Sequence, residues 1–249
     1  MESDISNYRI NDMQRKIKIP PLDIMLVGVT GAGKSSTIDS LLGKESAKIG
    51  RGTNPETKEI QSYRLNKYIE LWDTPGFGDS PEEDAKHLNA ISEILDPNCL
   101  FTIDGCKYRN AVDMVIVVID GSRKDLGVIY PVLNKVIFKS MGVQRGTESK
   151  RVLFIINQAD MAMKGRHWDS QNETPDGTLS EFLREQALSI QKRIEDNTGY
   201  KICTPLCYSA TNNFNTKELI DFILENIPNQ RKKLLSKEDL FWLAIKMLG

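Results

Sequence analysis

Hydrophobic and polar residues alternate along the chain in blocks that predict strands and helices in turn. The runs typical of buried strands are apolar and end at glycine or polar residues; they cover residues 22–29, 62–74, 112–120, 151–160 and 202–210. Between them, apolar residues recur at helical spacing over residues 35–43, 81–95, 126–142, 179–199 and 216–227. Each predicted strand is therefore followed by a predicted helix.

This alternation predicts an α/β fold, in which a mostly parallel central sheet lies between two layers of helices. One domain, residues 22–228, accounts for most of the chain. We expect residues 1–21 to form a polar leader and residues 229–249 to form a C-terminal helical extension. Residues 44–57 are polar and contain glycine and proline, so they predict a mobile loop.

Composition narrows the class of protein. Hydrophobic residues make up 40% and charged residues 27% of the 249 residues, and the net charge of −1 supplies no general attraction to nucleic acid or anionic lipid. No run of 18 apolar residues occurs, and the N-terminus lacks the apolar core of a secretory signal. The four cysteines lack CxxC spacing and are too few for a disulfide scaffold. We therefore interpret them as reduced thiols of a cytoplasmic protein.

Residues 28–35 read Gly-Val-Thr-Gly-Ala-Gly-Lys-Ser, which fits the phosphate-binding motif GxxxxGK[ST] between a predicted strand and a predicted helix. The glycines allow a tight turn, and the backbone N–H groups at the start of the helix can point at phosphate oxygens. Lys34 supplies a positive charge to the β- and γ-phosphates, and the Ser35 hydroxyl is placed to bind Mg²⁺. The predicted nucleotide contacts of this loop are Gly28, Gly31, Ala32, Gly33, Lys34, Ser35 and Ser36.

A second motif, Asp73-Thr-Pro-Gly76, ends the predicted strand that follows the mobile loop. An acidic residue at this place can hold Mg²⁺, and a glycine without a Cβ lets its N–H approach the γ-phosphate. The mobile loop must also bring a threonine to Mg²⁺; Thr53 and Thr57 are both candidates, and we favour Thr57 because it lies nearer the next strand. The predicted metal ligands are Ser35, Thr57 and Asp73, and the predicted catalytic residues are Lys34, Thr57 and Gly76.

A third motif, Asn157-Gln158-Ala159-Asp160, ends the predicted strand at residues 151–160. The Asp160 carboxylate can accept both hydrogen bonds that guanine offers from its ring N–H and its exocyclic amine, whereas adenine would leave it unpaired. At the end of the next strand, the N–H of Ala210 is placed to meet the guanine carbonyl. The predicted base-binding residues are Asn157, Gln158, Asp160, Ser209, Ala210 and Thr211.

The ordered set GVTGAGKS, DTPG, NQAD and SAT resembles the translation-factor-related class of P-loop GTPases. Era-like and ribosome-associated bacterial GTPases belong to this class, together with septin-like and immunity-related GTPases. The resemblance covers roughly residues 22–228. It implies a three-layer Ras-like G domain that binds GTP and GDP, uses Mg²⁺ and hydrolyses GTP. The sequence PETKE around Thr57 also resembles the effector-loop threonine of these families.

Two positions depart from the usual pattern. Gln158 stands where the NKxD motif has lysine, so the aliphatic stem is kept and the charge is lost. Phe77 stands where Ras-like proteins place the glutamine that orients the attacking water, and its side chain has neither donor nor acceptor. A hydrophobic residue there resembles the branch whose hydrolysis depends on a partner, a potassium ion or dimerisation. We therefore expect slow hydrolysis without assistance.

Together these features predict a GTPase that acts as a nucleotide-dependent switch or assembly factor, through a homodimer or a protein effector. A GTP-binding scaffold that hydrolyses very slowly or not at all is the first alternative, and an ATP-dependent enzyme, disfavoured by Asp160, is the second. Nothing in the sequence supports binding to nucleic acid or to the ribosome. The apolar residues 239–249 could dock on the domain, pair with another chain or begin a further helical region, and the basic residues 231–233 beside them allow contact with a membrane surface.

Overall fold

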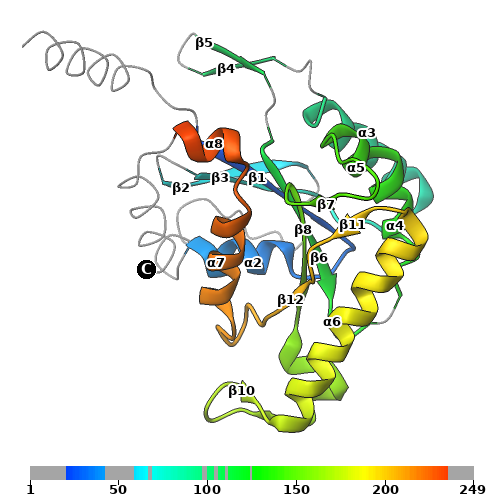
Figure 1. The fold of residues 1–249 in the computed structure, drawn as a ribbon, viewed down its shortest axis with the longest axis vertical. Coiled ribbons are helices and arrows are strands. Elements are labelled where there is room, and N and C mark those ends of the chain that lie inside the picture. Colours follow the sequence, from blue (N-terminus) through cyan, green and yellow to red (C-terminus); the bar gives the residue numbers. More distant parts are fainter. Residues whose placement is uncertain are drawn as a thin grey trace, which may run out of the picture.

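The computed structural model describes residues 21–42, 59–66, 69–96, 100–103, 106–109, 112–123 and 125–234. Strands and helices alternate along most of this length (Figure 1). The strands are β1 (Leu22–Gly28), β2 (Gln61–Asn66), β3 (Ile69–Asp73), β4 (Leu100–Ile103), β5 (Cys106–Arg109), β6 (Met114–Asp120), β7 (Glu148–Ser149), β8 (Val152–Asn157), β9 (Trp168–Asp169), β10 (Thr174–Pro175), β11 (Lys201–Ile202) and β12 (Leu206–Cys207). The helices are α2 (Lys34–Leu42), α3 (Pro81–Ile94), α4 (Ile129–Val132), η2 (Leu133–Ile137), α5 (Phe138–Ser140), η3 (Ala159–Gly165), α6 (Gly177–Thr198), α7 (Thr216–Asn226) and α8 (Asn229–Leu234).

The central sheet has six strands in the order β12-β8-β6-β1-β3-β2. All neighbouring pairs are parallel except β2 and β3, which are antiparallel. Strands β6 and β8 are buried along their whole length, because helices cover both faces of the sheet. The predicted α/β class and the mostly parallel sheet are confirmed.

Two apolar clusters, one on each face of the sheet, form the core. The first joins alternate sheet residues such as Val27 and Val117 to α3, to the α4–α5 segment and to α6. The second joins the intervening residues, such as Leu26 and Ile116, to α2 and α7. Figure 1 shows α2 and α7 on one side of the sheet and α3, α5 and α6 on the other. The alternation of side chains along each strand thus produces the three layers.

Two of the predicted strands are wrong in detail. The run at 62–74 forms two antiparallel strands, β2 and β3, with Gln61 opposite Asp73. The run at 202–210 is divided into β11, which pairs with β7, and β12, which joins the central sheet. Neither division is marked by a glycine; Pro205 lies directly before β12. Pro205 was a signal for the second break that the prediction overlooked, whereas the first break has neither glycine nor proline.

Three further features were not predicted. The segment after α3, for which the sequence predicted no strand or helix, contains the β4–β5 hairpin. The predicted helix at 126–142 has a π-helical middle, η2, where the hydrogen-bonding pattern widens. After β8 the chain forms the 3₁₀ segment η3 and the short β9–β10 hairpin before α6 begins.

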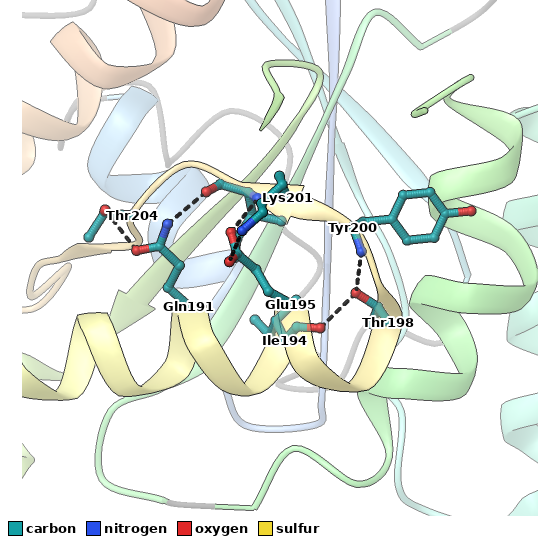
Figure 2. A network of polar contacts seen from close by, with 8 residues as sticks. Gln191, Ile194, Glu195, Thr198, Tyr200, Lys201 and Thr204 are labelled. Carbon is teal, nitrogen blue, oxygen red and sulfur yellow. Dashed lines mark hydrogen bonds and ion pairs between the residues drawn. The ribbon is translucent and has the colours of Figure 1, made fainter. Parts of the chain in front are cut away.

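The end of α6 is joined firmly to the segment that leads to β12 (Figure 2). Gln191 donates to the carbonyl of Ile202 at 2.9 Å and accepts from the Thr204 hydroxyl at 3.0 Å, while Glu195 accepts from the N–H of Ile202 at 3.1 Å. Gly199 ends the helix in the left-handed conformation, with φ of 73°. These bonds fix the path of the chain just before residues 209–211, which are predicted to bind the base.

Helix α8 lies near the amino-terminal ends of β1 and β6. There Arg231 forms an ion pair with Asp113 at 2.9 Å and contacts the carbonyl of Pro21. The Arg231 side chain is only 14% exposed, so it faces the domain. Residues 1–20, residues 43–58, which include the loop predicted at 44–57, and residues 235–249 lie outside the described residues. Within the described parts, no helix combines the length and apolar character that crossing a membrane requires.

Candidate functional site

The carboxyl ends of the parallel strands meet at one edge of the sheet, and most of the predicted site residues lie there. Gly28 at the end of β1 is in register with Val118 of β6, and Asp120 at the end of β6 is in register with Asn157 of β8. Ligands of open α/β sheets bind at this edge. The loops that follow β1, β3, β8 and β12 therefore form a single candidate site.

The phosphate loop has the backbone geometry that its glycines predict. Gly31 and Gly33 have φ of 81° and 89°, in the left-handed region that favours glycine. A Cβ on Gly28 would lie 2.3 Å from the carbonyl oxygen of Val118, so the loop leaves the sheet through a passage that admits no side chain. Ala32 is buried, and Ser36 is exposed in the first turn of α2.

Lys34 lies inside this loop. Its side chain is 6% exposed, and Nζ donates to the carbonyls of Gly28 and Val29 at 3.2 Å each. Burial lowers the pKa of Lys34 to about 8, against the opposite pull of the Asp73 and Asp79 carboxylates. A phosphate beside Nζ would stabilise the charged form of this buried ammonium group, so the site fits an anion.

Ser35 and Asp73 form the predicted centre for a magnesium ion. The Ser35 hydroxyl donates to Oδ2 of Asp73 at 2.7 Å, and Asp73 is 1% exposed at the end of β3. A hydroxyl and a carboxylate held together beside a phosphate site are the oxygen ligands that Mg²⁺ prefers, so these two residues fit the ion. The third predicted ligand, Thr57, and its alternative, Thr53, lie outside the described residues.

Gly76 packs directly on the phosphate loop. A Cβ at this position would lie 2.3–2.6 Å from atoms of Thr30, so only glycine fits. The next residue, Phe77, is held by two backbone hydrogen bonds. Its N–H donates to the carbonyl of Gly28 at 3.2 Å, and its carbonyl accepts from the N–H of Thr30 at 2.9 Å. The Phe77 side chain is 1% exposed in the apolar core beneath. It therefore points away from the site.

Asp160 supplies an acceptor for which the described residues provide no donor. Its Oδ1 atom is buried, and no group in the described ranges donates a hydrogen bond to it. A buried acceptor without a partner is costly unless a ligand satisfies it. The N–H groups of guanine are donors of the required kind, so Asp160 fits the predicted role.

Asn157 connects the loops predicted to bind the base to the phosphate loop. Its Nδ2 donates to the carbonyl of Ala32 at 3.1 Å, and its Oδ1 accepts from the N–H of Ala210 at 3.1 Å. A Cβ on Gly33 would lie 2.1 Å from Asn157 Nδ2, so the two loops are in close contact. The N–H of Ala210, which we predicted to meet the guanine carbonyl, is thus bonded to Asn157 in this structure.

The remaining predicted base-binding residues also lie at this edge. Gln158 has the left-handed φ of 61°, and its Nε2 donates to the carbonyl of Gly31 at 3.0 Å. Gln158 therefore bridges the same two loops as Asn157 and is more than an aliphatic stem. Ser209 is buried and its hydroxyl accepts from the backbone N–H of Asn212 at 3.3 Å, whereas Thr211 is exposed.

Sequence reasoning missed three residues beside the site. The Thr30 hydroxyl donates to Asp79 at 2.9 Å, and His87 of α3 contacts the carbonyl of Gly76. Thr30 and Asp79 are unspecified positions next to motifs, and His87 lies on a predicted helix whose facing surface the sequence does not reveal. None of the three had a signal of its own.

The chain was compared with known proteins. Residues 23–158, more than half of the chain, match the family described as 50S ribosome-binding GTPase. The mouse (Mus musculus) protein interferon-gamma-inducible GTPase 10 is 37% identical over 87 residues, which are 32% of this chain and 21% of the mouse protein. The matched segment thus spans about a fifth of that relative.

Solved structures agree on the fold. Toc33 from Arabidopsis thaliana, in complex with GDP and Mg²⁺, aligns with a TM-score of 0.57 and 15% identity over 89% of each chain. The bacterial dynamin GTPase LeoA from ETEC aligns with a TM-score of 0.55 and 14% identity over 91% of this chain and 38% of LeoA. At these identities the likeness concerns the fold alone.

Proposed function

The chain belongs to the 50S ribosome-binding GTPase family, and on that premise we propose that it binds GTP with Mg²⁺ and hydrolyses it to GDP and phosphate. The observation that carries the proposal is the bridge made by Asn157. This residue joins the phosphate loop, which holds Lys34, to the loop that holds Asp160, whose buried Oδ1 has no donor among the described residues. A single ligand with phosphates at one end and guanine at the other fits this arrangement.

The chain's own residues support the chemistry by charge and position. Lys34 offers a buried ammonium group, which strengthens its attraction to phosphate because little water competes with it. Ser35 and Asp73 would hold Mg²⁺, which when bound neutralises phosphate charge. Gly76 presents its backbone at the surface of the phosphate loop, where a γ-phosphate would meet it.

We expect slow turnover by the protein alone. Because the Phe77 side chain lies in the core, it cannot orient the attacking water, and we expect a rate on the order of 10⁻³ s⁻¹ or less. A partner, a potassium ion or self-association would raise this rate by ordering the loops around the γ-phosphate. On this basis we propose that the protein acts as a nucleotide-dependent switch or assembly factor.

Single-turnover hydrolysis of GTP tests the proposal. The rate is measured in Mg²⁺ over a range of protein concentrations, with potassium and with sodium, and with Ser35→Asn as the matched control. Release of phosphate that requires Mg²⁺ and is lost in Ser35→Asn supports hydrolysis at this site. Tight GTP binding without turnover under every condition would favour the alternative, a GTP-binding scaffold. The burial of the Phe77 side chain is the observation that favours this alternative.

A further inference from the structure

His87 contacts the backbone of the residue expected to meet the γ-phosphate. Its Nδ1 lies 3.1 Å from the carbonyl oxygen of Gly76, eleven residues earlier in the chain. A carbonyl oxygen can only accept a hydrogen bond, so Nδ1 carries the proton and donates. The ring also packs edge-on against Phe77, with centroids 6.3 Å apart and an interplanar angle of 72°. His87, which lies on α3, is thus held by two contacts, one with Gly76 and one with Phe77.

The peptide bond between Gly76 and Phe77 is held from both sides. His87 donates to its carbonyl, and its N–H donates to the carbonyl of Gly28 at 3.2 Å. Glycine is the most permissive residue in its backbone angles, so Gly76 would otherwise sample many orientations. The two bonds fix the plane that follows Gly76 and thereby limit the directions in which its own N–H can point.

Helix α3 holds the same loop at a second place. Oδ1 of Asp84 accepts from the N–H of Gly78 at 2.8 Å, on the other side of Phe77. A shift of Gly76 towards a γ-phosphate must therefore either break these bonds or move α3 with it. The contacts connect the state of the phosphate site to the position of a helix on the surface of the domain.

We propose that His87 is a positioning residue for the γ-phosphate: by holding the Gly76 carbonyl it orients the Gly76 N–H and couples it to α3. This inference rests on the proposed function, because it assumes that the triphosphate binds beside Gly76. Loss of the donor should therefore weaken contacts made only with the γ-phosphate, while contacts with GDP remain.

Two substitutions separate the donor from the ring. His87→Phe keeps a ring against Phe77 and removes the donor, whereas His87→Asn keeps an N–H at the place of Nδ1 and removes the ring. In His87→Phe we expect about a tenfold loss in the preference for a non-hydrolysable GTP analogue over GDP, and a similar loss in the single-turnover rate. His87→Asn should recover most of both. Asn89→Ala, an exposed change on the same helix, is the matched control.

The readouts distinguish positioning from a structural role. A structural role predicts that both His87 variants lower the melting temperature while the ratio of analogue to GDP affinity stays at the wild-type value, and that result would overturn the inference. If wild type binds the analogue but shows no turnover, the hydrolysis proposal fails, and the affinity ratio still tests His87. If wild type turns over GTP and His87→Phe matches it in rate and ratio, only the inference about His87 fails.

The protonation of His87 gives an independent test. The chain has two histidines, so the imidazole nitrogens of His87 can be assigned in long-range ¹H–¹⁵N spectra by comparison with His87→Phe. We expect the neutral ring to carry its proton on Nδ1. A neutral ring with an unprotonated Nδ1 could not donate to Gly76 and would overturn the proposed positioning.

Discussion

The hydroxyl of Thr30 donates a hydrogen bond to the carboxylate of Asp79 at 2.9 Å, and this bond ties the phosphate loop to the segment that follows Gly76. Asp79 also raises the pKa of Lys34, although burial has the larger, opposite effect. The Asp79 carboxylate therefore acts on the same ammonium group that a triphosphate would contact. A negative charge in this place should repel the phosphates of a bound nucleotide.

Asp79→Asn should strengthen binding of a GTP analogue by up to about fivefold, and binding of GDP by less, because the γ-phosphate brings the larger charge to Lys34. The effect is kept small because Asp79 is exposed and solvent screens its charge. Titrations at low and high salt measure it, and the gain should shrink as salt rises. Glu93→Gln serves as the control, because it neutralises an exposed acidic residue in the last turn of α3. Weaker binding of the analogue by Asp79→Asn would show that the carboxylate assists the nucleotide.

We expect Asp160 to determine the choice of base, because its buried Oδ1 accepts no hydrogen bond from the described residues. We expect ATP to bind at least about a hundredfold more weakly than GTP, a difference near 3 kcal/mol. Asp160→Asn should lose affinity for GTP and gain affinity for xanthosine triphosphate, whose extra carbonyl accepts from the new amide. Competition titrations measure all three nucleotides, and equal affinity of wild type for ATP and GTP would contradict the assignment.

Nucleotide binding should take up a proton at Lys34. Burial lowers the pKa of the free Lys34 to about 8, and phosphate oxygens favour the charged form, so the pKa rises on binding. Below pH 8 both states are protonated and this residue contributes no pH dependence. Between pH 8 and the higher pKa of the complex, affinity should fall as pH rises, with up to about one proton taken up. Calorimetry at pH 8.5 in two buffers of different ionisation enthalpy measures the uptake.

Lys34→Arg is the matched control, because the guanidinium group stays charged over this range. If the variant retains measurable binding, its proton uptake at pH 8.5 should be smaller than that of wild type. Wild-type binding at pH 8.5 without proton uptake would show that Lys34 is already protonated before the nucleotide arrives.

The sequence predicted the parts of the site that depend on local geometry. The positions of Lys34, Asp73 and Asp160 at one edge of the sheet follow from the rule that the loops at the carboxyl ends of parallel strands meet there; their roles stay predictions. The glycine pattern of the phosphate loop likewise specified its backbone, as the positive φ of Gly31 and Gly33 shows.

The contacts between loops could not be predicted in the same way. The bond from Ala210 to Asn157 joins residues 53 positions apart and depends on how β12 sits beside β8. The bond from His87 depends on which face of α3 meets the loop after β3, and helical spacing alone does not define that face. The break between β2 and β3 was missed because Asn66 is a single turn-favouring residue there, with no glycine or proline beside it.

Asp23 should make the fold less stable as pH rises. Burial raises its pKa to about 7, although the Trp72 indole donates to it at 2.8 Å; Asp113 and Glu70 add to the rise and Arg231 opposes it. A raised carboxyl pKa contributes stability that is full below its unfolded value near 4 and is lost as pH rises through 7. Chemical denaturation of wild type from pH 5 to 8 should show this loss. Asp23→Asn should flatten it and be the more stable protein at pH 8, whereas Asp196→Asn, an exposed change on α6, should keep the wild-type slope.

Phe77 should matter first for stability and only then for hydrolysis. Its side chain is 1% exposed among core residues, so Phe77→Ala leaves a cavity and should lower the free energy of unfolding by about 3–5 kcal/mol. Phe77→Leu fills most of the space and should cost less. Because the ring points away from the phosphate loop, the single-turnover rate of the folded Leu variant should stay within about tenfold of wild type. Denaturation and hydrolysis measured on the same preparations test both statements. A Leu variant as stable as wild type but a hundredfold slower would show that the ring itself organises catalysis, and the core position of Phe77 would then have to change when GTP binds.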